Sequence, residues 1–189
     1  MNKIEQRLEQ QKSTNRAMQS YVLTLYEMVL EIEPENILEI GVQFGQSTKT
    51  MLLGLSNNGH GKLFSIDHKS RDTILDEEHE DLKKYWEFFK SDSHDPKAME
   101  EAKKALKEGE MYDMLFIDGD HKMPGVKQDF DEFGSLVKPG GLIVLHDITN
   151  NNEDVHELWE TITWEKFGFN WGKSKTHIIP GFGLVKKPM

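Results

Sequence analysis

Short apolar runs alternate along the chain with longer stretches in which apolar residues recur every three or four positions. The short runs are typical of buried strands, and the longer periodic stretches are typical of amphipathic helices. A polar helical stretch opens the chain, and Pro34 ends the apolar helix that follows it. The pattern predicts helices at residues 21–32, 47–55, 74–84, 97–107, 126–137 and 153–163, strands at 36–40, 63–66, 86–89, 114–117 and 142–145, a turn at 138–141, and two further strands within 167–185.

Strands that are separated by helices pair in parallel, because the chain must cross back before it adds the next strand. The expected product is an α/β fold, a doubly wound sheet with helices on both faces and ligands beyond the carboxyl ends of its strands. No repeat and no Gly/Ser/Pro-rich linker divides the sequence, so residues 1–189 are expected to form a single domain. Residues 1–32 are open to two roles, a lid or a contact between copies in a homo-oligomer.

Composition excludes several kinds of partner and site. The chain carries 33 Asp and Glu against 23 Lys and Arg, and this net charge of −10 argues against a nucleic-acid partner, which needs a basic footprint. There is no cysteine, which excludes disulfides, thiolate metal sites and a cysteine nucleophile. The polar start has no signal-peptide core, and the longest apolar runs are too short to span a bilayer, so a cytoplasmic protein without membrane contact is expected.

Polar residues follow each of the first five predicted strands. Because the carboxyl ends of parallel strands meet at one edge of a sheet, these residues are expected to line a common ligand site. They are the loop at 41–48, Asp67, the segment 91–93, the segment 118–121 and the pair His146-Asp147.

The first of these loops contains Gly41 and Gly45, which permit positive φ and a close approach of the backbone to a ligand. The helix that follows offers its first N–H groups and its positive dipole end to a carboxylate or a phosphate. The Gly-x-x-x-Gly spacing is neither the dinucleotide-binding fingerprint nor a P-loop. A purely structural turn before a helix is the alternative interpretation.

The next two strand ends suit other parts of a nucleoside. Asp67 ends an apolar strand, where a carboxylate can accept both hydroxyls of a ribose or, alternatively, cap a helix. Asp92 and Ser93 suit the edge of an adenine ring, but they are also plausible turn residues before Asp95-Pro96.

Three segments make the sequence similar to a known family: residues 37–48 (ILEIGVQFGQST), 116–121 (FIDGDH) and 136–147 (LVKPGGLIVLHD). They resemble class I S-adenosylmethionine (SAM)-dependent methyltransferases, and more narrowly the small-molecule O-methyltransferases of the macrolide-sugar methyltransferase and cephalosporin hydroxylase group. The resemblance implies a Rossmann-like, mostly parallel seven-stranded sheet with an antiparallel C-terminal strand. It makes residues 36–189 the cofactor-binding catalytic core, whereas residues 1–32 carry no motif.

The resemblance also implies roles for individual residues. The methionine carboxylate of SAM would lie on the first loop, with its ammonium near Glu39, its ribose on Asp67 and its adenine near Asp92 and Ser93. The implied cofactor-binding set is Glu39, Gly41, Gly45, Ser47, Asp67, Asp92, Ser93 and Asp118.

A metal site and a catalytic base are implied at the fourth and fifth strand ends. Asp118, His146 and Asp147 stand where metal-dependent members bind a divalent ion, usually magnesium, so Mg²⁺ or Mn²⁺ is expected here. His146 replaces a carboxylate there, and an imidazole is a poorer ligand for magnesium than for manganese, iron or zinc. His121 lies at the spacing from Asp118 at which related enzymes place a catalytic lysine or histidine, where it would serve as the base for transfer to a hydroxyl.

These observations predict a metal-assisted, SAM-dependent O-methyltransferase that acts on a hydroxyl of a small molecule, such as a sugar or a glycosylated metabolite. Two alternatives stay open: a metal-dependent oxygenase that uses Asp118, His121 and His146, and a non-catalytic SAM-binding module. The glycine loop and the α/β order argue against the oxygenase. A base beside metal ligands argues against a module that only binds.

Overall fold

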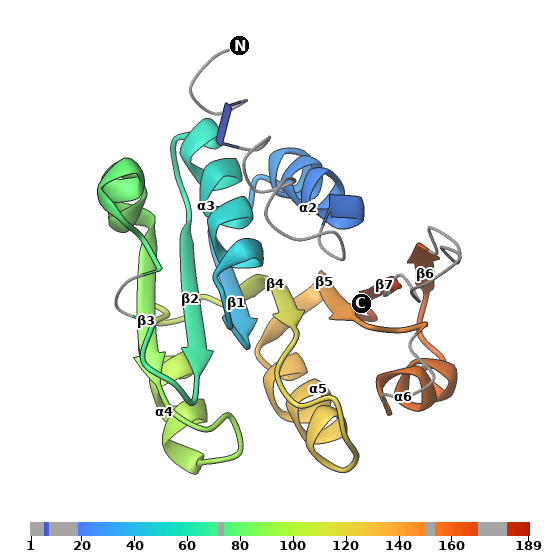
Figure 1. Cartoon of the computed structure of the whole chain (residues 1–189). Helices are drawn as coiled ribbons and strands as arrows, with labels where there is room; N and C mark the ends of the chain where they lie inside the picture. Colours follow the sequence, from blue (N-terminus) through green and yellow to red (C-terminus); the bar gives the residue numbers. More distant parts are fainter. Residues whose placement is uncertain (1–5, 8–18, 72–73, 150–153, 170–180) are drawn as a thin grey trace.

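The computed structural model describes residues 6–7, 19–71, 74–149, 154–169 and 181–189 (Figure 1). The strands are β1 (Asn36–Ile40), β2 (Lys62–Asp67), β3 (Trp86–Lys90), β4 (Tyr112–Ile117), β5 (Val137–His146), β6 (Lys166–Phe169) and β7 (Phe182–Lys186). The helices are α2 (Gln19–Ile32), α3 (Gln46–Asn58), the 3₁₀ helix η1 (Glu77–Tyr85), α4 (Pro96–Lys104), α5 (Gly125–Gly134) and α6 (Val155–Thr161). The start of the predicted N-terminal helix and the middle of the predicted tail lie outside the described residues.

The seven strands form one sheet in the order β3-β2-β1-β4-β5-β7-β6 (Figure 1). Strands β1 to β5 pair in parallel, and β7 pairs antiparallel with both β5 and β6. The predicted doubly wound, mostly parallel sheet with an antiparallel C-terminal strand is therefore confirmed. The strand order reverses between β1 and β4, and in such sheets the crevice at that point is the usual place for a ligand.

Apolar side chains cover both faces of the sheet. Helices α2 and α3 lie on one side of it and α4, α5 and α6 on the other (Figure 1). Within β1, Ile37 packs on the side of α2 and α3, while Leu38 and Ile40 pack on the side of α4 and α5. This burial on both faces is why the central strands read as continuous apolar runs. None of the described helices is long and apolar enough to cross a membrane.

Two predicted elements are corrected. The helix expected at residues 74–84 is the 3₁₀ helix η1, in which His79, Leu82 and Tyr85 are buried. A spacing of three fits the three residues per turn of a 3₁₀ helix better than the period of an α-helix.

The turn expected at residues 138–141 lies inside β5. Gly140 N–H donates to the carbonyl of Lys187 at 2.9 Å, and Lys187 N–H donates to the carbonyl of Gly141 at 2.9 Å. The strand therefore starts earlier than predicted, because the C-terminal segment supplies hydrogen-bond partners there.

Candidate active site

A cleft of about 450 Å³ opens at the carboxyl ends of β1 to β4. Its lining residues come from the segments 40–43, 66–71, 91–94 and 118–121, which follow those four strands. The volume lies within the usual range for a small-molecule site. Among the predicted cofactor-binding residues, those that line the cleft are Gly41, Asp67, Asp92, Ser93 and Asp118.

The glycine loop passes tightly against the end of β4. Gly41 has φ +89° and Gly45 has φ +73°, so both adopt the conformation that the sequence predicted. A Cβ on Gly41 would lie 2.1 Å from the backbone oxygen of Asp118. Position 41 therefore requires glycine for two reasons, its positive φ and the contact with β4.

The side chains of Glu39 and Ser47 are buried and bond to each other. The carboxylate of Glu39 is fully buried and accepts hydrogen bonds from the hydroxyls of Ser47 (2.6 Å), Thr48 (2.8 Å) and Ser65 (2.6 Å). Burial raises the pKa of Glu39 to about 7, although the three hydroxyls act in the opposite direction. Within the described part of the chain, neither Glu39 nor Ser47 lines the cleft, and their predicted contacts with a cofactor stay predictions.

Asp67 holds two loops together. Its Oδ2 accepts from the backbone N–H groups of Val42 and Gln43, both at 3.0 Å, and its Oδ1 accepts from the N–H of Lys69 at 2.8 Å. Arg71 donates to both oxygens at 3.0 and 2.9 Å. Burial alone would raise the pKa of Asp67, but the N–H donors and the Arg71 guanidinium lower it overall. The predicted contact of Asp67 with a ribose stays a prediction.

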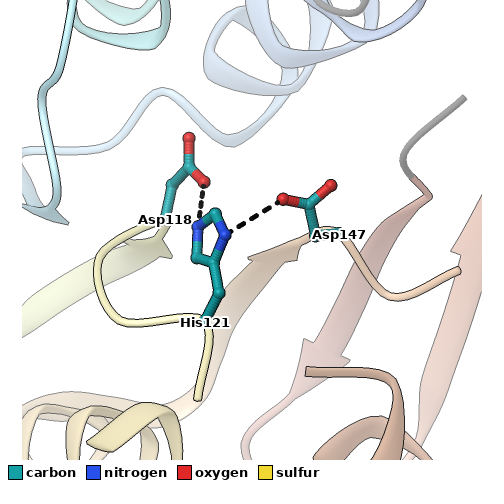
Figure 2. Close-up of side chains that lie close together, drawn as sticks. All are labelled: Asp118, His121 and Asp147. Carbon is teal, nitrogen blue, oxygen red and sulfur yellow. Dashed lines mark hydrogen bonds and ion pairs between the residues drawn. The ribbon is translucent and has the colours of Figure 1, made fainter. Parts of the chain in front are cut away.

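Two carboxylates and a histidine meet where β4 and β5 end (Figure 2). His121 Nε2 lies 3.1 Å from Asp118 Oδ1, and His121 Nδ1 lies 3.5 Å from Asp147 Oδ2. The imidazole thus stands between the two carboxylates (Figure 2). Asp147 has φ +64°, a strained conformation for a residue with a side chain, and such strain is concentrated at functional sites.

His146 closes the cluster from the buried side. Its Nδ1 lies 3.0 Å from Asp118 Oδ1 and 3.2 Å from Asp147 Oδ2, while its Nε2 is buried with no hydrogen-bond partner among the described residues. Burial lowers the pKa of His146, but the two carboxylates outweigh it and raise the pKa to about 10. The two histidines in turn hold the pKa of Asp118 well below its usual range, against the effect of burial.

These residues fit a divalent cation. One ligand atom from each of Asp118, His121 and Asp147 can be chosen so that all three lie within 4.8 Å of one another. Ligands of an octahedral ion lie about 2.1 Å from the metal, so two of them are at most about 4.2 Å apart. The three side chains would therefore have to move only slightly closer together to bind an ion. The structure brings together the predicted metal residues Asp118, His146 and Asp147, and it adds His121 to the same cluster.

Two residues beside the site had not been predicted. Asp129 on α5 is fully buried, and its Oδ1 lies 3.4 Å from Nε2 of His94, which lines the cleft. Its sequence signal is an acid at position 129 on the apolar face formed by Val126, Phe130 and Phe133. Tyr21 on α2 places its ring 4.8 Å from the ring of His146, and no signal in the sequence indicates this contact.

Comparisons with known proteins agree with this fold. A family described as a methyltransferase domain matches residues 38–148. The chain is similar in structure to the O-methyltransferase from Bacillus cereus in complex with SAH (18% identity, TM-score 0.66, 99% of this chain and 91% of that one). It is also similar to the O-methyltransferase TomG from Streptomyces achromogenes, involved in tomaymycin synthesis, in complex with SAM (17% identity, TM-score 0.65, 96% and 89%).

A third similar structure is MycE from the mycinamycin biosynthetic pathway, in complex with Mg, SAH and mycinamycin VI (16% identity, TM-score 0.58, 89% of this chain and 50% of that one). At these identities the solved structures show the fold. The family match covers more than half of the 189 residues, and it gives the oxygenase alternative no support. The chain belongs to the family of methyltransferase domains.

Proposed function

We propose that the protein is a SAM-dependent O-methyltransferase that is assisted by a divalent cation and methylates a hydroxyl of a small molecule. The observation that carries the proposal is the cluster of Asp118, His121 and Asp147 beside a cleft of small-ligand size. Family membership supports methyl transfer. The SAM and SAH bound by TomG and the Bacillus cereus enzyme support the choice of donor.

In this proposal the donor lies across the strand ends. Its adenine meets the segment 91–93, its ribose lies near Asp67, and its methionine carboxylate faces the start of α3, where the positive end of the helix dipole favours an anion. Arg71 and three backbone N–H groups already occupy the oxygens of Asp67. A ribose on this carboxylate therefore replaces at least one contact of Arg71.

The acid-histidine cluster supplies the chemistry for oxygen. The side chain of His121 is 31% exposed, whereas that of His146 is 9% exposed, so His121 is the histidine that can reach an acceptor. His121 takes the hydroxyl proton as the acceptor oxygen bonds to the methyl carbon. The bond between sulfur and that carbon breaks, its electron pair stays on sulfur, and the products are the methyl ether and S-adenosylhomocysteine (SAH).

Asp118, His146 and Asp147 would hold the cation, which when bound would stabilise the negative charge that develops on the acceptor oxygen, and the proton transfer falls to His121. The mixed nitrogen and oxygen donors suit Mn²⁺ as well as Mg²⁺. For the acceptor we propose a sugar or a glycosylated metabolite, which the mycinamycin VI bound by MycE supports. The net charge of −10 argues against a nucleic acid as the acceptor.

Calorimetry with SAM and SAH tests the donor. Turnover is then followed by mass spectrometry, as the gain of one methyl group on a panel of sugars and glycosylated metabolites with Mg²⁺ or Mn²⁺. His121→Ala is expected to keep SAH binding while turnover falls about 10²- to 10⁴-fold, the usual contribution of a general base. His60→Ala is the matched control, because His60 pairs with Glu35 on the surface and lies before β2, at the opposite edge of the sheet.

Two results would contradict the proposal. One is a wild-type protein that binds neither SAM nor SAH at millimolar concentration. The other is a His121→Ala variant that turns over as fast as the His60→Ala control.

A further inference from the structure

Asp129 is a fully buried carboxylate on α5, under the floor of the cleft. Its Oδ2 lies 3.3 Å from the position that a Cβ on Gly119 would take, and Gly119 lines the cleft. Neither oxygen of Asp129 makes a hydrogen bond of ordinary geometry within the part of the chain that the structure describes. A buried carboxylate in this situation is costly, so its remaining contacts call for an explanation.

One ionisable neighbour of Asp129 is His94, a residue that lines the cleft. His94 Nε2 lies 3.4 Å from Asp129 Oδ1 and 3.2 Å from the carbonyl of Gly125. A carbonyl and an ionised carboxylate only accept hydrogen bonds, so Nε2 faces α5 as a donor when it carries the ring proton. On the other side of the ring, Nδ1 lies 3.4 Å from Asp92 Oδ1, which also accepts the backbone N–H of His94 at 3.0 Å.

Ser93 is another cleft-lining residue that acts on Asp129. Burial raises the pKa of Asp129 to about 6, and the nearby hydroxyl of Ser93 is the main influence in the opposite direction. Ser93 and His94 are adjacent residues of one loop, and the backbone N–H of Asp120 acts on the same buried carboxylate from another. Asp129 thus ties the segment 91–94 to α5.

We propose that Asp129 is a positioning residue for the recognition of adenine, which acts by fixing Ser93 and His94 in the wall of the cleft. The inference rests on the proposed function, which puts the adenine of SAM against the segment 91–93. Adenine presents a donor at N6 and an acceptor at N1, whereas hypoxanthine presents an acceptor at O6 and a donor at N1. Polar groups that are held in one orientation distinguish the two bases strongly, and groups that can turn distinguish them less.

The test compares the dissociation constants of SAH and S-inosylhomocysteine, its hypoxanthine counterpart, by calorimetry. Wild type is expected to prefer SAH, and Asp129→Asn is expected to lower that preference about tenfold. Asp131→Asn is the matched control. It makes the same substitution on the same helix, but Asp131 is exposed and pairs with Lys127. The control is expected to keep the wild-type preference. A purely structural role for Asp129 would lower stability without changing the ratio of the two constants.

A folded Asp129→Asn variant with the wild-type preference would overturn the inference, as would a wild-type protein that binds both ligands equally. If Asp129→Asn does not fold, His94→Ala removes the same contact from a loop side chain that is 27% exposed. The same loss of preference is expected, and an unchanged preference in His94→Ala overturns the inference. Failure of wild type to bind SAH at all overturns the proposed function itself, and the inference with it.

Discussion

The pH dependence of stability should report the ionisation of Glu39. This carboxylate has no solvent contact, and its three hydrogen-bond donors are neutral hydroxyls. Neutral donors compensate only part of the cost of burying a charge, so the folded protein holds the proton of Glu39 more tightly than the unfolded chain does. Glu39→Gln keeps the size of the side chain and removes the ionisation.

The size of the effect follows from the shift in pKa. For Glu39 the pKa rises from 4.5 to about 7 on folding, and each unit corresponds to about 1.4 kcal/mol, so the group accounts for about 3 kcal/mol. Since the folded pKa is the higher one, this stability is fully present below pH 4.5. It is lost as pH rises toward 7, and above pH 7 the loss is complete.

Urea unfolding of wild type and Glu39→Gln across this pH range is the assay. Other ionisable groups contribute equally to both proteins, so the difference between the two free energies of unfolding isolates Glu39. Wild type is expected to lose about 3 kcal/mol relative to Glu39→Gln between pH 4.5 and pH 8. Glu108→Gln, at an exposed position, controls for the substitution itself. A difference between wild type and Glu39→Gln that stays constant with pH would refute the reasoning.

Two further predictions concern the loops of the cleft. Gly41→Ala and Gly109→Ala both place a side chain at positive φ, which costs about 1–2 kcal/mol, but only the Cβ at Gly41 meets another atom, the backbone oxygen of Asp118 at 2.1 Å. In urea unfolding Gly41→Ala is therefore expected to cost several kcal/mol more than Gly109→Ala, and equal costs would contradict the contact. Arg71→Ala removes the guanidinium from both oxygens of Asp67, so calorimetry is expected to show SAH binding up to about tenfold tighter; weaker binding would show that Arg71 supports the cofactor.

Sequence reasoning succeeds where one rule applies to several elements at once. Strands that alternate with helices pair in parallel, and their carboxyl ends then meet at one edge. Asp118, His121 and Asp147 come from two strand ends, and the structure brings them within 4.8 Å. The bounds of β1 agree with the prediction because both of its faces are buried and Pro34 ends the preceding helix.

The partners that a side chain contacts are harder to predict than its position on a strand. Glu39 lies opposite Ser65 in the parallel pairing of β1 and β2, and the hydroxyl of Ser65 donates to it. This contact depends on how the two strands align, and the alignment cannot be read from the sequence of either strand alone. Asp67 occupies the expected strand end, yet its oxygens already accept protein donors. The apolar run of β2 places Asp67 at the end of a strand, but it does not indicate which loops will contact that carboxylate.

Asp129 is a side chain whose partners the sequence could have indicated. On a helix with Val126, Phe130 and Phe133 facing the sheet, position 129 has the same spacing as a buried residue, so an acid there must enter the core. A buried acid needs partners, and partners at the sheet edge can come only from loops that follow strands. An acid on the apolar face of a helix that starts just after a strand end is therefore itself a prediction of a positioning residue. The comparison of SAH with S-inosylhomocysteine in Asp129→Asn tests that rule along with the residue.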